Sequence, residues 1–137
     1  MIRVFLDANI FFAAAWSEES GIGKLWERQG IQLVTSSYAL MEAVRNIQLK
    51  KPAAAPRLSA LVGKVEVSSL TALLNSGHGL PEKNLPILEA AIGSSCTALL
   101  TGDVTHFGHL IGTEVEGTRI LTVRSRATIA ASKLPWF

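Results

Sequence analysis

Two carboxylates stand where the chain could do chemistry. Asp7 and Asp103 are the only aspartates in the sequence, and each comes just after a predicted buried strand, at residues 2–6 or 97–100. In open α/β sheets, ligands bind in the crevice outside the carboxyl ends of the strands. If these two strands are neighbours, the carboxylates face each other, and a cation between them relieves their repulsion. The spacing alone also allows a simpler role, in which each aspartate only caps the helix or turn that follows it.

Oxygen ligands without nitrogen or sulfur favour a hard cation, so a metal between these acids would be Mg²⁺ or Mn²⁺. The two histidines nearest to Asp103, His106 and His109, are three residues apart, a spacing that a zinc site could use. No cysteine pair or second histidine pair supports such a site. The sequence therefore favours an oxygen-lined crevice over a zinc centre.

The elements that must position these acids alternate between strand and helix. Three consecutive apolar residues, Val4, Phe5 and Leu6, indicate a strand covered on both faces, as in a parallel sheet. Strands are expected at 2–6, 31–35, 65–67, 97–100 and 119–123, and helices at 10–16, 20–29, 37–51, 53–62 and 84–93. We also expect a short helical turn and a glycine-rich loop within 70–81, and a short helix within 125–137. This alternation predicts an α/β domain with a mostly parallel sheet.

Two of the predicted helices have features that bear on the site. In the helix after residue 36, we expect the apolar side to consist of Leu40, Met41, Val44 and Ile47, with Glu42 beside it. Asn84 is expected to cap the helix that closes at residue 93.

Composition limits the class of protein. A chain of 137 residues suits one domain that buries its own core. The longest stretches without charge, 67–81 and 90–102, are too short and too polar to span a membrane, and Asp7 interrupts any signal-peptide pattern. The single cysteine, Cys96, cannot form an internal disulfide, which fits a reducing compartment. We expect a cytoplasmic protein with no membrane segment.

The net charge of +2 does not by itself indicate a nucleic-acid partner, but the charges are unevenly distributed. Residues 43–65 include Arg45, Lys50, Lys51, Arg57 and Lys64 and no acid, and residues 119–137 are likewise basic without an acid. Such runs could hold a phosphate backbone, or could be ordinary solvated helix faces. Within the first run, Arg45, Lys50 and Lys51 are the candidates for RNA binding.

Four blocks, taken in order and spacing, resemble the PIN-domain nucleases, a family that includes the VapC-type toxin ribonucleases. The blocks are Leu6-Asp-Ala-Asn9, Thr35-Ser36 followed by Glu42, Lys83-Asn-Leu-Pro-Ile-Leu88, and Leu99-Leu-Thr-Gly-Asp103 with His106-Phe107. The resemblance covers nearly the whole chain and implies a single PIN-like domain over residues 1–137. It implies a three-layer α/β/α sandwich around a central, mostly parallel sheet of four to five strands. It also implies Mg²⁺- or Mn²⁺-dependent cleavage of RNA by a homodimer, as the toxin of a toxin–antitoxin pair.

Position by position, the resemblance assigns roles to individual side chains. Asp7, Glu42 and Asp103 match catalytic, metal-binding acids, whereas Asn9 and Thr101 match auxiliary polar positions. A further acid is expected at the position that Asn84 occupies in this chain.

Asn84 leaves several alternatives open. Its amide oxygen could bind a metal but brings no negative charge, so the site could hold a single cation or a weak second one. Glu82 or Glu89 could supply the missing charge, although charged side chains are mostly exposed. The chain could also be a catalytically degenerate PIN-like module that binds RNA or a protein partner. A phosphatase of the type that begins with Asp-x-Asp is disfavoured, because Asn9 takes the place of the second aspartate.

Overall fold

The computed structural model describes residues 1–17 and 21–122, and a six-stranded sheet forms the centre of this part of the chain. The strands are β1 (Ile2–Leu6), β2 (Ile31–Thr35), β3 (Glu66–Val67), β4 (Ala98–Thr101), β5 (Glu114–Val115) and β6 (Thr118–Thr122). They lie in the order β3-β2-β1-β4-β6-β5, and every neighbouring pair is parallel except the antiparallel pair β5 and β6. The predicted mostly parallel sheet is confirmed, with one strand more than expected.

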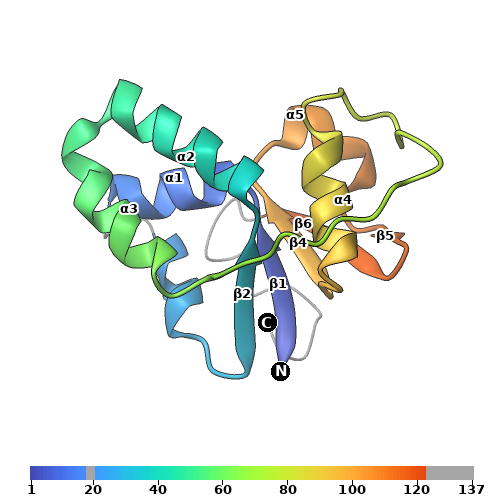
Figure 1. Cartoon of the computed structure of the whole chain (residues 1–137), viewed down its shortest axis with the longest axis horizontal. Coiled ribbons are helices and arrows are strands. Elements are labelled where there is room, and N and C mark those ends of the chain that lie inside the picture. Colours follow the sequence, from blue (N-terminus) through green and yellow to red (C-terminus); the bar gives the residue numbers. More distant parts are fainter. Residues whose placement is uncertain (18–20, 123–137) are drawn as a thin grey trace.

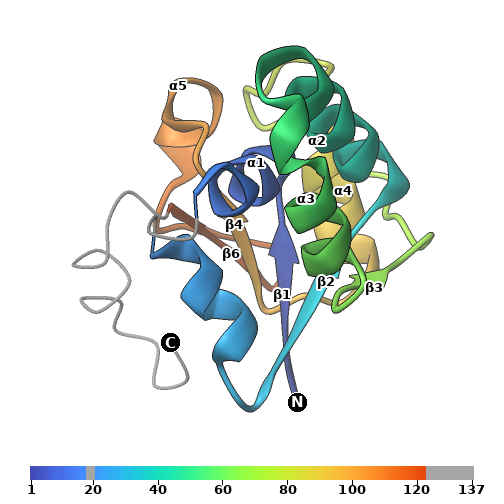
Figure 2. The same cartoon turned by 90° about the vertical axis from the view of Figure 1, so that its left-hand side faces the viewer.

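Helices cover both faces of this sheet (Figures 1 and 2). The α-helices are α1 (Ala8–Trp16), α2 (Ser37–Lys50), α3 (Ala55–Val62), α4 (Leu85–Gly93) and the short α5 (Val104–Phe107). Single 3₁₀ segments are η2 (Ile22–Glu27), η3 (Pro52–Ala54) and η4 (Gly108–Leu110). None of the helices described is long and apolar enough to cross a membrane.

The apolar strand residues alternate between two cores, which makes the three layers. Val4 and Leu6 of β1 face a core shared with α1, α2 and α3. Phe5, between them, faces a second core shared with α4 and with Phe107 of α5. Side chains of a strand alternate between the faces of the sheet, so a strand apolar at every position must be covered on both sides. The predicted α/β/α sandwich is confirmed.

The expected apolar side of α2 is wrong in part. Ala39, Ala43 and Ile47 are its fully buried residues, whereas Met41 is 64% and Val44 40% exposed. Ala43 and Ile47, four residues apart on one helical face, lie in the core shared with α1 and α3, whereas Ala39 lies in the core shared with α4. Choosing the largest apolar residues missed this face because the two alanines are small.

Other differences between expectation and structure are local. Residues 70–81 form no helix, and within the segment expected to be helical at 20–29 only Ile22–Glu27 is helical, as a 3₁₀ helix. The unexpected strand β5 forms a hairpin with β6 through Glu116 and Gly117, whose φ angles of 46° and 90° suit a two-residue turn. The helix expected at 125–137 lies outside the described residues.

Candidate active site

The pairing of β1 with β4 brings the two aspartates together. The strands are parallel neighbours in which Leu6 is opposite Leu100, so both chains leave the sheet at the same edge. Asp7 follows β1 directly, and Asp103 comes two residues after Thr101, the last residue of β4. The expectation that the strands before these two aspartates are neighbours is therefore confirmed.

Asp7 is a buried carboxylate, 4% exposed, at the N-cap of α1. Its Oδ1 accepts a hydrogen bond from the Ala8 amide at 2.7 Å, and its Oδ2 accepts one from the Thr101 hydroxyl at 2.8 Å. The pKa of Asp7 is raised to about 6, mainly by burial and to a lesser extent by the charges of Glu42 and Asp103, while the two hydrogen bonds act to lower it. A cation beside Asp7 would stabilise the ionised carboxylate and so lower this pKa again.

Thr101 links the two aspartates. Its hydroxyl donates to Asp7 and accepts a hydrogen bond from the backbone amide of Asp103 at 3.0 Å. Asn9 holds the same turn from the other side, because its Oδ1 accepts from the Gly102 amide at 2.7 Å. Both auxiliary positions thus fix the turn that carries Asp103.

Asp103 caps α5 and has a dense set of hydrogen bonds. Its Oδ1 accepts from the His106 amide at 3.0 Å, and its Oδ2 lies 2.8 Å from His106 Nδ1. The same Oδ2 accepts from Asn84 Nδ2 at 3.2 Å. Burial raises the pKa of Asp103, but the hydrogen bonds and charge of His106 and the bond from Asn84 outweigh burial and leave it below its ordinary value. Asp103 is therefore ionised at neutral pH.

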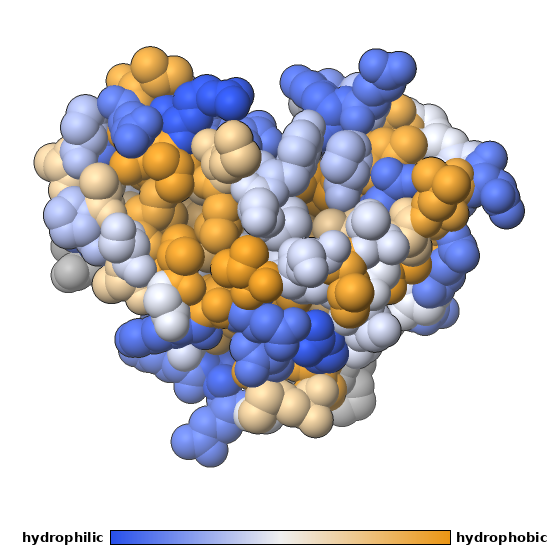
Figure 3. Space-filling view, in the orientation of Figure 1, coloured by the Kyte–Doolittle hydropathy of each residue, from blue (hydrophilic) through white to orange (hydrophobic). Residues whose placement is uncertain are grey.

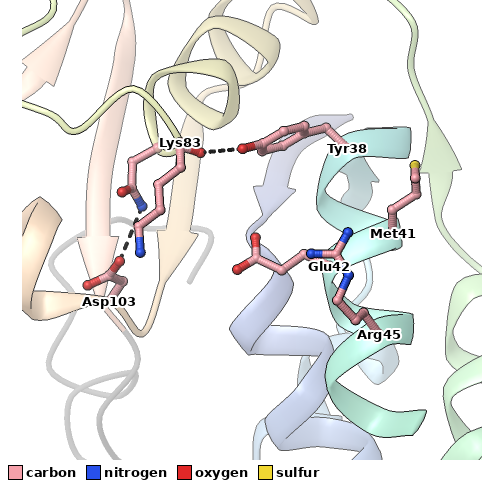
Figure 4. A pocket seen from close by; sticks show the side chains of 7 residues that line it. Tyr38, Met41, Glu42, Arg45, Lys83 and Asp103 are labelled. Carbon is pink, nitrogen blue, oxygen red and sulfur yellow. Dashed lines mark hydrogen bonds between the residues drawn. The ribbon is translucent and has the colours of Figure 1, made fainter. Parts of the chain in front are cut away.

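A pocket of about 270 Å³ opens above these groups. It is lined by Tyr38, Met41, Glu42, Arg45, Lys83, Asn84 and Asp103. Figure 4 shows Glu42 and Arg45 on α2, across the pocket from Asp103 and Lys83. Glu42 is exposed, and its charge is felt by Asp7, so the third predicted acid faces the same site.

Asn84 stands at the N-cap position of α4, as expected, but its side chain makes no capping hydrogen bond. Its Nδ2 donates to Asp103 instead, and its Oδ1 is buried without a hydrogen-bond partner within the described ranges. The predicted capping role is wrong. The Asn84 side chain bonds to the Asp103 carboxylate instead, and the local sequence does not reveal this tertiary contact.

The structure does not bring the two suggested compensating acids to the pocket. Glu89 Oε2 accepts a hydrogen bond from the Leu74 amide at 3.2 Å, which turns it toward the segment that crosses α4. Glu82 is exposed and is not part of the pocket wall.

Of the three basic residues predicted to bind RNA, only Arg45 lines the pocket. The ammonium groups of Lys50 and Lys51 lie 5.6 Å and 4.8 Å from the ring centres of Phe12 and Trp16. Sequence reasoning missed two pocket residues, Tyr38 and Lys83, although Lys83 belongs to one of the four recognised blocks and is next to Asn84.

The donors fit a hard divalent cation by chemical type. Asp7, Glu42 and Asp103 offer carboxylate oxygens, and the orphaned Asn84 Oδ1 is an additional buried acceptor that would gain a partner. In the described part of the chain, no three acidic, histidine or cysteine side chains lie close enough together to hold a metal as they stand. Glu42 lies on α2 across the pocket from Asp103 (Figure 4), so its exposed side chain would have to adopt another rotamer to share a cation with the two aspartates.

Comparison with known proteins adds evidence on the fold. No family model matches the chain, and no curated protein matches it either. Two solved structures have a fold similar to that of this chain. One is the crystal structure of VapBC2 from Rickettsia felis, bound to a DNA fragment from its promoter, with a TM-score of 0.66 at 16% identity. The other is the structure of VapBC-1 from nontypeable Haemophilus influenzae, with a TM-score of 0.58 at 14% identity. Each match covers 88% of this chain and 98% of the other.

The fold is PIN-like. The architecture implied by the four sequence blocks is thereby confirmed.

Proposed function

We propose that the protein is a ribonuclease that depends on Mg²⁺ or Mn²⁺ and hydrolyses phosphodiester bonds in RNA. The observation that carries this proposal is the pair Asp7 and Asp103, joined through the Thr101 hydroxyl at the carboxyl ends of neighbouring parallel strands. Glu42 and the cationic Arg45 face this pair across an open pocket. Carboxylates that bind a divalent cation, beside a basic side chain that attracts phosphate, suit phosphodiester hydrolysis.

Each residue has a distinct task in this reaction. Asp7 and Asp103 would hold the cation, with Glu42 and Asn84 Oδ1 as further oxygen ligands. A bound cation lowers the pKa of water and neutralises charge on the phosphate. Arg45 would hold the phosphate backbone without reading sequence.

Hydrolysis itself requires proton transfer. Water attacks phosphorus, its proton passes to a carboxylate at the pocket, and the bond from phosphorus to the leaving oxygen breaks. The leaving oxygen takes up a proton from solvent water, and the carboxylate returns its own proton to solvent. Glu42 is exposed at the pocket wall, and we propose that one of its carboxylate oxygens accepts the proton of the attacking water while the other is available to the cation.

We further propose that the protein is a toxin held inactive by an antitoxin and that it forms a homodimer. Both similar structures are VapBC complexes, which supports a protein partner. The surface agrees, because Met41 and Val44 of α2 are exposed beside a shallow groove formed with Ser37, Leu40 and Gln48. Figure 3, in the orientation of Figure 1, shows hydrophobic side chains gathered on the half of the molecule where α2 and α3 lie. Exposed apolar patches of this kind are typical of protein–protein contact sites.

The test is cleavage of a fluorescent single-stranded RNA by purified protein in EDTA, Mg²⁺ or Mn²⁺. We expect cleavage only with a divalent cation, and a loss of at least about 100-fold in Asp103→Asn, as is usual when one group that stabilises the transition state is removed. Glu82→Gln is the matched control, because it removes an exposed acid that does not line the pocket. Equal cleavage by Asp103→Asn and the control would contradict the proposal.

One observation favours a second function, a non-catalytic module that binds RNA or a protein. The amide of Asn84 already donates to Asp103, so this carboxylate is partly satisfied without a cation. In that case the protein would bind RNA equally well in EDTA and Mn²⁺ and would cleave it in neither.

A further inference from the structure

Lys83 is a pocket residue with a fixed backbone and an uncommitted side chain. The Tyr38 hydroxyl on α2 donates a hydrogen bond to the Lys83 carbonyl oxygen at 2.7 Å, across the mouth of the pocket. The next residue, Asn84, is tied to Asp103. The main chain at Lys83 is therefore held from two sides, by α2 and by the turn after β4.

The side chain of Lys83 is directed to the site. It lines the same pocket as Glu42, Arg45 and Asp103, and Figure 4 shows it extending into the pocket toward Asp103. Among the described residues, no carboxylate forms an ion pair with its ammonium group. A lysine held at its backbone and left without a partner beside an acidic cluster is placed to bind an anion that enters the pocket.

The charges of the pocket indicate which anion this is. Lys83 and Arg45 lie on opposite walls, one before α4 and one on α2, and the carboxylates lie between and below them. A phosphodiester brought between the walls meets a positive charge on each side. Because Asn84 is neutral, the site has one carboxylate fewer with which to attract a second divalent cation, and a fixed ammonium group can supply that positive charge instead.

We propose that Lys83 binds the phosphodiester that is cut, and that its ammonium group provides the positive charge that a second metal ion would otherwise supply. This inference rests on the proposed ribonuclease function. Tyr38 is a positioning residue, because its hydroxyl contacts the Lys83 backbone and not the substrate.

Binding measured in EDTA tests this without relying on cleavage. The probe is a fluorescein-labelled single-stranded RNA of about ten nucleotides, titrated with protein by anisotropy at several salt concentrations. We expect Lys83→Gln to weaken binding about tenfold and to make the dependence of log K on log salt shallower by about 0.7, the value for one lost phosphate contact on a single strand. Lys83→Arg retains the charge and should bind like the wild type.

Lys64→Gln is the matched control, because it removes the same charge from an exposed residue just after α3, away from the pocket. If Lys83→Gln and Lys64→Gln bind RNA with equal affinity and equal salt dependence, Lys83 is an ordinary solvated lysine and the inference is wrong. Absence of RNA binding by the wild type in EDTA would also overturn it.

Kinetics in Mn²⁺ separate this inference from the proposed function. We expect Lys83→Gln to lower kcat by about 100-fold, as for removal of a transition-state donor, and Lys83→Arg to restore most of it. Tyr38→Phe should give an intermediate loss, because it retains the ring but removes the 2.7 Å hydrogen bond. A wild type that cleaves alongside a Lys83→Gln variant with unchanged kcat refutes the role of Lys83 alone. A wild type that does not cleave refutes the ribonuclease itself.

Discussion

Replacing Asn84 by aspartate tests how the crevice balances its charges. In the wild type, Asn84 Nδ2 donates to Asp103 Oδ2 at 3.2 Å. In Asn84→Asp, two carboxylates would meet at that distance, and two unit charges so placed repel by ~5 kcal/mol at an effective dielectric constant of about 20. The lost hydrogen bond adds about 1 kcal/mol. Rotation of the side chains and sharing of a proton relieve part of this repulsion, so we expect a net loss of stability of about 2–4 kcal/mol at pH 7 in EDTA.

The measurement is thermal unfolding of both proteins in EDTA and in Mn²⁺. For a domain of this size, the expected loss lowers Tm by roughly 6–15 °C in EDTA. Mn²⁺ should restore most of the difference, because a cation between the carboxylates replaces repulsion by attraction. Its affinity should rise at least about tenfold, equivalent to about 1.4 kcal/mol. The loss should also shrink toward pH 4, where one of the two carboxyl groups is protonated.

Asn75→Asp provides the control, because it makes the same chemical change on an exposed loop. If Asn84→Asp is as stable as Asn75→Asp in EDTA and binds Mn²⁺ no more tightly than the wild type, position 84 does not belong to a cation site.

Three further predictions concern stability. Asp7 has a pKa of about 6 in the folded protein against an ordinary 3.8. The free energy of unfolding of the metal-free protein should therefore fall by about 3 kcal/mol as pH rises from about 4 to about 6. Asp7→Asn should abolish that part of the pH dependence in denaturant titrations. Thr101→Val removes the 2.8 Å hydrogen bond to Asp7. It should raise the Asp7 pKa further in an NMR titration and lower the free energy of unfolding by about 1–3 kcal/mol at pH 7. An unchanged pKa would show that this bond is unimportant. A Cβ at Gly93 would lie 2.3 Å from the Thr71 backbone, so Gly93→Ala should destabilise by at least about 2 kcal/mol in urea, whereas Gly63→Ala, with no contact closer than 3.6 Å, should be nearly neutral.

The parts of the fold that the sequence predicts are those with strong local signals. The consecutive apolar residues of β1 and β4 could only be buried on both faces, and this placed Asp7 and Asp103 at one edge of the sheet. The buried side of α2 escaped prediction because alanine carries little hydrophobic signal, although Ala39 and Ala43 are fully buried. The hairpin at Glu116 and Gly117 had one usable signal, the glycine that permits positive φ.

The site shows the same limit. The acids followed from strand ends and motif spacing, but the contact between Asn84 and Asp103 joins residues 19 apart on different elements. The pocket position of Lys83 likewise depends on a hydrogen bond to Tyr38, 45 residues earlier. Contacts of this kind form only when helices from opposite layers meet over the edge of the sheet, so no local sequence pattern predicts them.

Direct titration of Mn²⁺ into the purified protein tests the central claim, that the crevice of Asp7, Glu42 and Asp103 binds the cation on which RNA cleavage depends. We predict one calorimetric binding site in the wild type, its loss in Asp103→Asn, and its retention in Glu82→Gln. Absence of Mn²⁺ binding by the wild type, or binding that Asp103→Asn leaves unchanged, would contradict this account.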